Sequence, residues 1–408
     1  MKINMIKSFK ISNFYSIGED SQLLSFAISA KDSLEQSSSK IDRQYINLVN
    51  CFIGHNASGK TTILKAISFL LWLINNAYTS TRFDEKIPLI THQLFHDQPT
   101  KIEMEFFNGE NHYLYKLVLN KSYIEAEFLG KKLTRSYSRI FEYTRSGKEW
   151  NFQKLASMLV INKNDLSRFK DRHNVPVLSS LIETGYLPEL LFLRNFKSNI
   201  TEFGHVDEHR LLKFSLISEI LAKDINLRKE SLNFVKDIDL GIASFNVHKF
   251  SKPDHDNPIV KAVEQHWLEC KHESSFGKIT LPLIFESNGT RHSLQIFLDI
   301  LPVLQTGGVV ILDEIEAGLH PYTVKKIIYL FENPKTNPKK AQLIFSTHQH
   351  LLLNDRTKTQ IFLVEKENTK FQSEVYRLDE VEGVRNDENY FQKYLAGAYG
   401  AIPNIKWN

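Results

Sequence analysis

Three short apolar runs have the length and composition of buried β-strands. They cover residues 46–54 (INLVNCFIG), 309–312 (VVIL) and 341–348 (AQLIFSTH). Continuous apolar runs of this kind are typical of strands that are buried on both faces. An unbroken helical pattern follows the first run at 61–74, and a second helix is expected at 290–304.

The pattern changes twice between the first run and the other two. Residues 101–149 read as strands, with a hairpin turn expected at Asn108-Gly109. From Phe152 to about Cys270 the pattern is helical and charged, most clearly at 209–238. We therefore predict one α/β domain made of residues 1–150 and 276–408, interrupted by a helical insert at 151–275.

Composition adds limits to this interpretation. The chain has 408 residues, a net charge of +4 and two cysteines, Cys51 and Cys270, so no disulfide framework is expected. The mild positive charge permits nucleic-acid contact without indicating it. The N-terminus lacks the pattern of a signal peptide, and the most apolar run, 63–74, is too short to cross a membrane. We expect a soluble cytoplasmic protein with no membrane contact.

Residues 51–62 (CFIGHNASGKTT) carry the strongest chemical signal. Their spacing fits the phosphate-binding pattern G-x-x-x-x-G-K-[ST], and a strand precedes the loop while a helix follows it. Loop N–H groups and the helix N-terminus would hold phosphate oxygens, with Lys60 on the β/γ-phosphates and Thr61 on Mg²⁺. A chance match is the alternative, which the flanking strand and helix disfavour. The predicted ATP-binding residues are Gly54, His55, Asn56, Ala57, Ser58, Gly59, Lys60, Thr61 and Thr62.

The other two apolar runs end in residues that would complete such a site. Asp313 follows the run at 309–312 and could hold Mg²⁺, and Glu314 could polarise the attacking water. His348 ends the run at 341–348 and could sense the γ-phosphate. The alternatives are a core strand that happens to end in acids and a structural histidine. With Lys60, we predict Glu314 and His348 as catalytic residues.

The stretch Glu286-Ser287-Asn288-Gly289-Thr290 stands at the start of the helix predicted at 290–304. Ser287 and the backbone N–H of Gly289 at a helix N-terminus would form a second anion site. Because the chain already has its own phosphate loop, a second γ-phosphate site is most useful on another molecule's ATP. A simple helix N-cap is the alternative.

In this order the blocks resemble the ABC-type ATPases of the OLD-like and RloA-like group, relatives of RecF and the SMC proteins. FKISNFYSI (9–17) is similar to the opening strand, ESNGTR (286–291) to the ABC signature, VVILDEIEAGLHP (309–321) to Walker B with the D-loop, and YLAGAYGAIP (394–403) to the RloA-like C-terminal segment. The resemblance implies an α/β ABC-type P-loop ATPase head, in which a mixed sheet flanked by helices is joined by an antiparallel β-subdomain and an inserted helical lobe.

The resemblance also implies how the site is assembled. Two protomers would bind two ATP molecules head to tail, and residues 286–290 of one chain would complete the Lys60, Asp313 and Glu314 site of the other. Asn288 stands where many ABC proteins have Gly. Gln93 is the candidate for the glutamine loop. The resemblance leaves open whether the dimer assembles further.

For function, the resemblance implies a Mg²⁺-dependent ATPase that serves as sensor or scaffold in a bacterial anti-phage, abortive-infection system. OLD-family nucleases carry a TOPRIM domain after the ATPase, whereas only 60 residues follow His348 here. We therefore expect a companion effector, with a nuclease as first choice. The alternative is a RecF-like repair ATPase that binds DNA directly.

Two further patterns in the sequence have competing interpretations. HVDEH (205–209) fits the inverted zincin pattern, so a metallopeptidase using His205, Glu208 and His209 is a third hypothesis, although no third ligand is evident. The cluster Lys163, Arg168, Lys170 and Arg172 could contact nucleic acid, but a solvated helix face is the simpler interpretation.

Overall fold

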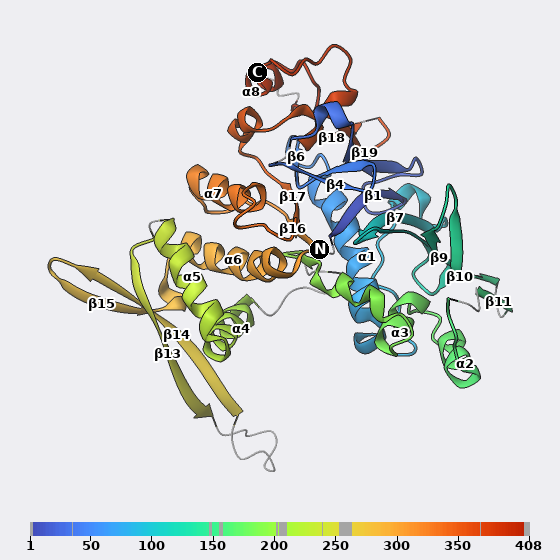
Figure 1. Cartoon of the computed structure of the whole chain (residues 1–408), viewed down its shortest axis with the longest axis horizontal. Helices are drawn as coiled ribbons and strands as arrows, with labels where there is room; N and C mark the ends of the chain where they lie inside the picture. The colour runs from blue at the N-terminus through green and yellow to red at the C-terminus, as the bar shows by residue number, and fades with distance from the viewer. Residues whose placement is uncertain are drawn as a thin grey trace. The chain divides into compact units, whose positions relative to one another are not determined.

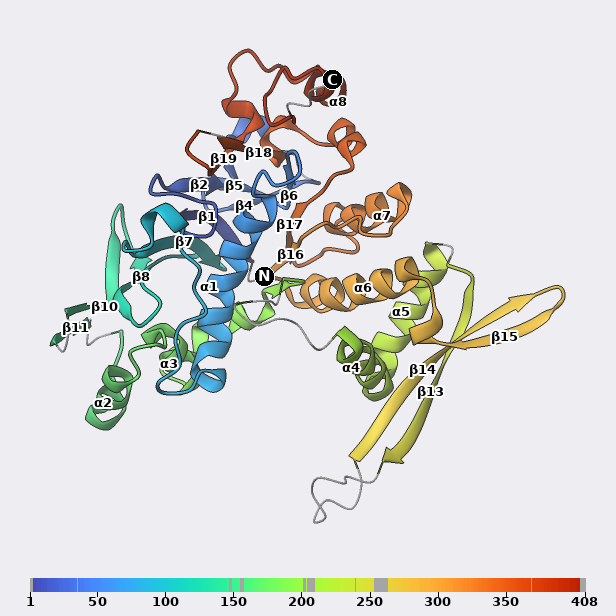
Figure 2. The same cartoon turned by 180° about the vertical axis from the view of Figure 1, so that it is seen from behind.

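The computed structural model describes the chain except residues 1–2, 35, 147–148, 155–157, 201–202, 204–209, 239, 253–262, 368 and 404–408. The chain forms two compact units (Figures 1 and 2). Unit 1 consists of Met1–Gly204, Pro302–Ile315 and Ile327–Asn408, and unit 2 of His205–Leu301 and Glu316–Lys326. Among the described residues, no helix is long and apolar enough to cross a membrane.

A mixed sheet forms the centre of unit 1. Its strand order is β12 (Lys197–Ser198), β16 (Val309–Leu312), β17 (Gln342–Ser346), β6 (Val49–Ile53), β18 (Ile361–Glu367) and β19 (Gln372–Arg377). Neighbouring strands are parallel except β18 and β19, which are antiparallel. Strands β6, β16 and β17 are buried throughout, which explains their unbroken apolar sequences. The three strands predicted from these runs are confirmed.

A seven-stranded antiparallel sheet lies in the same unit. Its order is β11 (Glu149–Lys154), β10 (Tyr137–Ser146), β9 (Ile124–Lys132), β8 (Asn111–Leu119), β7 (Thr100–Asn108), β1 (Asn4–Ser12) and β2 (Gln22–Ser25). Asn108 pairs with Asn111, and Gly109 in the turn has φ 63°, so the predicted hairpin is confirmed. A small sheet follows the order β3 (Ala27–Ile28), β5 (Gln44–Asn47) and β4 (Ser38–Ile41).

Helix α1 (Lys60–Ser80) joins the parts of unit 1. It packs against β16, β17 and helix α3 (Val177–Glu183), and both views show it between the two large sheets (Figures 1 and 2). Other helices with residues in unit 1 are α2 (Lys163–Asp171), α6 (Asn288–Thr306, from Pro302 onward), α7 (Pro321–Glu332, from Ile327 onward) and α8 (Tyr390–Leu395). Short 3-10 helices include Gln93–Phe95, Pro188–Asn195 and His350–Asp355.

Unit 2 combines helices with a three-stranded antiparallel sheet. The sheet has the order β13 (Ile242–Lys252), β14 (Val263–Ser274) and β15 (Gly277–Pro282). Helix α4 (Arg210–Lys223) packs on β14, and α5 (Ile225–Asp237) packs on β13. Helix α6 (Asn288–Thr306) lies in this unit up to Leu301, where Phe297 stacks on Phe234 with ring centroids 4.3 Å apart.

This division differs from the predicted regions 1–150, 151–275 and 276–408. Residues 151–200 belong to unit 1, and the signature stretch 286–290 belongs to unit 2. The predicted helical insert contains α4 and α5 but also the two long strands β13 and β14. Helices pack on this sheet, and among its described side chains Leu268 of β14 is buried whereas its neighbour Trp267 is 42% exposed. The apolar content of strands β13 and β14 is therefore too low to give a clear strand signal in the sequence.

Candidate functional site

The phosphate-loop motif occupies the turn between β6 and α1, as its spacing predicts. Gly59 caps α1 with φ 110°, and a Cβ there would lie 2.2 Å from Ser373 Oγ. A Cβ on Gly54 would lie 2.1 Å from the carbonyl oxygen of Val364. Both glycines are thus required by close packing against β18 and β19, and Gly59 also by its left-handed backbone.

Lys60 is buried at the first position of α1, with 6% of its surface exposed. Its ammonium donates to the carbonyl oxygens of Gly54 (2.8 Å) and His55 (3.0 Å), so it lies across the loop. Asn56, Ala57 and Thr61 are exposed. The loop therefore presents a cation, a helix N-terminus and a hydroxyl, the combination that holds phosphate oxygens.

The N-terminal strand region contributes to the same loop. Ser16 Oγ donates to the hydroxyl of Thr62 (3.2 Å) and bonds Ser373 Oγ (2.8 Å), so residues from three distant segments meet beside Gly59. The ammonium of Lys65 lies 4.9 Å from the ring centroid of Tyr15. The predicted opening strand, 9–17, is therefore β1 plus a turn that supports the phosphate loop.

Asp313 and Glu314 follow β16 directly, and Ser346 at the end of β17 contacts both. The Ser346 hydroxyl donates to Asp313 Oδ1 at 2.5 Å and accepts the backbone N–H of Glu314 at 2.8 Å. Asp313 is half-buried, whereas Glu314 is exposed and has φ 48°. A positive φ is uncommon for a glutamate, and it marks a chain that turns sharply at the strand end.

Asn199 is a contributor that sequence reasoning missed. Its amide group pairs with the backbone of Asp313 in both directions, because Asp313 N–H donates to Asn199 Oδ1 and Asn199 Nδ2 donates to the Asp313 carbonyl, each at 2.9 Å. It follows the two-residue strand β12, which is parallel to β16. The main chain at the Walker B acid is thus held from one side by Asn199 and from the other by Ser346.

His348 lies two residues beyond Ser346 and is half-buried. Because β16, β17 and β6 are adjacent and parallel, with Leu312 opposite Phe345 and Ser346 opposite Phe52, their carboxyl ends lie at one edge of the sheet. The structure therefore brings the segments of Lys60, Asp313-Glu314 and His348 to one edge, where open α/β sheets bind ligands.

Gln93 is exposed in the 3-10 helix Gln93–Phe95. Asn13 holds this segment: its side chain accepts the N–H of His92 (3.0 Å) and donates to the carbonyl oxygens of Phe95 (3.0 Å) and Gln98 (2.7 Å). The segment is therefore tied to the turn that follows β1. The role of Gln93 as the glutamine-loop residue stays a prediction.

The signature stretch, in unit 2, begins helix α6 as expected. Ser287 is exposed, and its hydroxyl accepts the N–H of Thr290 (3.1 Å), which is an N-cap. Ser287 therefore does cap helix α6, as the alternative interpretation states. An N-cap does not exclude that the same residue also binds an anion. Glu286 bonds His272 (2.8 Å), whereas the side chain of Asn288 accepts from Arg291.

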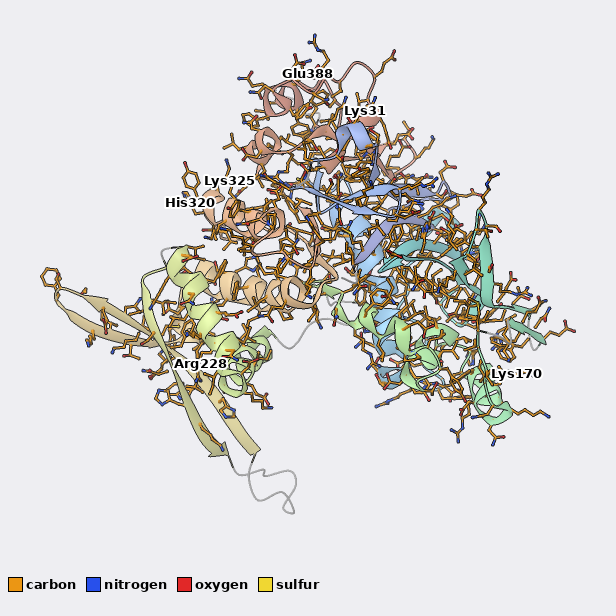
Figure 3. The ribbon with its side chains drawn as sticks, viewed as in Figure 1. Lys31, Lys170, Arg228, His320, Lys325 and Glu388 are labelled. Carbon is orange, nitrogen blue, oxygen red and sulfur yellow. The ribbon has the colours of Figure 1, made fainter. Side chains whose placement is uncertain are left out.

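Gly289 is needed for a close backbone contact within unit 2. A Cβ there would lie 2.6 Å from the carbonyl oxygen of Gly318, in the segment that precedes α7. A cavity of about 590 Å³ opens beside it. Its polar lining residues are Asp237, Ser287, Thr290, Ser293, His320, Tyr322, Thr323 and Lys326. Figure 3 shows His320 and Lys325 pointing outward near α7.

The remaining sequence predictions have different outcomes. His205, Glu208 and His209 lie outside the described residues, and the described ones contain no cluster of three or more His, Cys, Asp or Glu suited to a metal. Arg172 donates to the carbonyl oxygens of Tyr78 (2.7 Å) and Thr81 (2.8 Å) and so holds the end of α1. Lys163, Arg168 and Lys170 are exposed on α2, and Figure 3 shows Lys170 pointing outward.

The fold and the strand-end arrangement are those of a P-loop ATPase of the AAA type. The chain belongs to the family described as "AAA domain, putative AbiEii toxin, Type IV TA system", whose model matches residues 49–354. Membership implies ATP binding. No curated protein matches the sequence. Among solved structures, the chain is similar to the recombination mediator protein RecF with ATP from the RecFOR pathway. The two share 12% identity and a TM-score of 0.34, over 85% of this chain and 94% of that one.

Proposed function

We propose that this chain hydrolyses ATP with Mg²⁺ between two head-to-tail copies and serves as sensor or scaffold of an OLD-like bacterial anti-phage system. ATP closes the dimer, and hydrolysis or a trigger releases or activates a companion effector, with a nuclease as first choice. The ATPase part and the defence part rest on different support.

The observation that carries the ATPase part is the contact of one serine with both Walker B acids at the sheet edge that also bears Lys60. Ser346 orients the Asp313 carboxylate and fixes the backbone of Glu314, whose exposed side chain extends from the strand end. A fixed, exposed carboxylate beside a phosphate loop is suited to accept a proton from an attacking water. His348, on the neighbouring strand end, is suited to contact the γ-phosphate.

The donor set also fits Mg²⁺. Thr61 offers an exposed hydroxyl in the first turn of α1, and Asp313 offers a carboxylate that Ser346 already orients. Hard oxygen ligands of this kind are what Mg²⁺ prefers. When bound, the ion would neutralise charge on the phosphate oxygens.

The signature stretch supports the head-to-tail dimer. Ser287 is exposed at the start of a 19-residue helix, and the cavity of about 590 Å³ reaches Gly289. A helix N-terminus with a serine hydroxyl is suited to a phosphate oxygen. In the proposed dimer, that oxygen belongs to ATP on the partner's Lys60 loop, so each nucleotide becomes part of the interface.

The defence role is supported by separate observations. The description of the family refers to a toxin of a toxin–antitoxin system. The resemblance of the signature and of residues 394–403 to the RloA-like group points the same way. In this proposal, the effector supplies the toxic chemistry and the ATPase controls it.

The test is tagged purification together with the neighbouring genes of the native locus, with Glu314→Gln and wild type in parallel and ATP added. We expect Glu314→Gln to abolish turnover and to trap an ATP-bound species of twice the 47.4 kDa chain mass in native mass spectrometry, together with a stoichiometric partner. The exposed Glu382, changed to Gln, is the matched control and should behave as wild type.

Different outcomes reject different parts of the proposal. If Glu314→Gln hydrolyses ATP at the wild-type rate and stays monomeric, the ATPase mechanism is wrong. If the dimer forms but is recovered with DNA in a strongly salt-dependent manner and without a partner protein, the RecF-like repair function replaces the defence role.

A further inference from the structure

The segment 390–401 connects two parts of the candidate site that the motifs leave separate. It contains α8 and the turn that follows, and its three tyrosines, Tyr390, Tyr394 and Tyr399, are buried in one cluster with Ile53 of β6 and Leu353. We propose that Tyr394 in this segment is a positioning residue that sets the phosphate loop and the His348 segment relative to each other. The inference rests on the proposed ATPase function and adds a residue to it.

Contact with the phosphate loop runs through one carbonyl group. The carbonyl oxygen of Ala401 accepts the hydroxyl of Tyr394 at 2.9 Å and the backbone N–H of His55 at 3.2 Å. His55 in turn accepts the ammonium of Lys60 on its own carbonyl oxygen, at 3.0 Å. The Tyr394 hydroxyl and the backbone of His55 therefore share the Ala401 carbonyl oxygen, and the same His55 residue holds the Lys60 ammonium through its own carbonyl group.

Contact with the His348 segment uses the other part of the same side chain. The Tyr394 ring packs against the ring of His350, with centroids 4.9 Å apart. The backbone N–H of His350 donates to the carbonyl oxygen of His348 at 3.1 Å. One buried side chain, 2% exposed, thus bonds Ala401, the residue that contacts the phosphate loop, through its hydroxyl and packs on the His348 segment through its ring.

The surrounding residues hold this arrangement against backbone strain. Ala401 has φ 56°, a left-handed conformation that costs a non-glycine residue roughly 1 kcal/mol or more. Its N–H donates to Glu365 Oε2 at 3.0 Å, and the same oxygen accepts the hydroxyl of Tyr376 at 3.3 Å. At Gly400, a Cβ would lie 2.7 Å from the Tyr376 hydroxyl. A segment that needed only to cover the core would not require a strained residue aimed at the loop.

Tyr399 provides a matched control in the same segment. It is also buried, and its hydroxyl donates to Glu388 at 2.8 Å rather than toward the phosphate loop. Figure 3 shows Glu388 at the outer side of this region. Tyr399→Phe therefore removes one buried hydroxyl and one hydrogen bond, as Tyr394→Phe does, but leaves the hydrogen bond between Tyr394 and Ala401 intact.

The experiment compares Tyr394→Phe with Tyr399→Phe. The Kd for ATP is measured with each change placed in the Glu314→Gln background, and KM and kcat are measured with each change in the otherwise wild-type chain. The melting temperature of every variant is measured as well. Loss of the hydrogen bond that holds the Ala401 carbonyl in place beside the loop should raise the Kd and KM for ATP about fivefold in Tyr394→Phe. We expect kcat to change less than twofold, because the ring that contacts His350 remains. Tyr399→Phe should bind ATP as its parent does, with a similar change in melting temperature.

Two results overturn the inference. The first is an unchanged affinity for ATP in Tyr394→Phe while the parent binds ATP. The second is an equal loss of ATP affinity in both variants that follows the fall in their melting temperatures, because a merely structural role would have that effect. If the parent chain binds no ATP, the proposed function itself fails, and the inference fails with it.

Discussion

The Ser346 hydroxyl offers the sharpest test of how the site is organised, because it contacts both acidic residues. In Ser346→Ala, Asp313 Oδ1 loses the donor at 2.5 Å, and the backbone N–H of Glu314 loses the acceptor at 2.8 Å. Ser346 is fully buried, so the change removes one oxygen without altering the surface. The Asp313 carboxylate can then rotate, and the turn that carries Glu314 loosens.

The magnitude follows from the kind of hydrogen bond that is lost. A hydrogen bond to a charged group contributes about 1.5–3 kcal/mol. If that energy serves to orient the carboxylate in the transition state, kcat should fall about 10- to 150-fold. The Mg²⁺ concentration for half-maximal activity should rise as well, because Asp313 is a proposed ligand.

The assay is steady-state ATP hydrolysis with a Mg²⁺ titration, and Ser68→Ala is the matched control. Ser68 is a buried serine whose hydroxyl donates to the Leu64 carbonyl (3.0 Å) and bonds Ser198 Oγ (2.7 Å), without contact to Asp313. A kcat for Ser346→Ala within twofold of wild type, in a folded protein, would refute the reasoning. An equal loss in Ser68→Ala would show that the effect is one of general packing.

Two further predictions concern Asn199 and the buried Glu127. Asn199→Ala removes both hydrogen bonds to the Asp313 backbone, so kcat should fall about tenfold with little change in the KM for ATP, measured by initial rates. Glu127 is fully buried and accepts hydrogen bonds from Tyr115 and two backbone N–H groups, and burial raises its pKa from 4.5 to about 7. Its folded form therefore binds a proton more tightly than its unfolded form, so stability is full below about pH 4.5 and falls by roughly 3 kcal/mol as the pH rises through 7. Glu127→Gln should flatten the melting temperature between pH 5 and 8 relative to wild type.

Sequence periodicity predicted the parts of the fold that are buried on both faces. Strands β6, β16 and β17 leave unbroken apolar runs, because nothing polar fits between two covered faces. Strand β12 left no such signal, since two residues are too few to show a period. Strands β13 and β14 pair with each other over long stretches, and helices pack on them. Their strand pattern in the sequence is less clear than the helical pattern at 209–238, so the region is predicted as helical.

The candidate site shows a similar limit. Lys60, Asp313 and Glu314 were predicted because each occupies a fixed place in a motif whose spacing reflects its chemistry. Ser346 and Asn199 are ordinary polar residues in sequence, and only strand pairing brings them to Asp313 from 33 and 114 positions away. No local pattern encodes such a contact, because it depends on which strands become neighbours.

The end of β17 connects the separate arguments about this site. Ser346 there holds the two Walker B acids, His348 follows two residues later, and His350 packs against Tyr394. Tyr394 donates a hydrogen bond to Ala401, whose carbonyl oxygen also accepts the N–H of His55 in the phosphate loop. A displacement of this one strand end would therefore move the proposed metal ligand, the proposed base and the proposed sensor together. If ATP does close a dimer, this strand end is where a change at the γ-phosphate would reach the 390–401 segment, and Tyr394→Phe and Ser346→Ala should then show non-additive effects on turnover when combined.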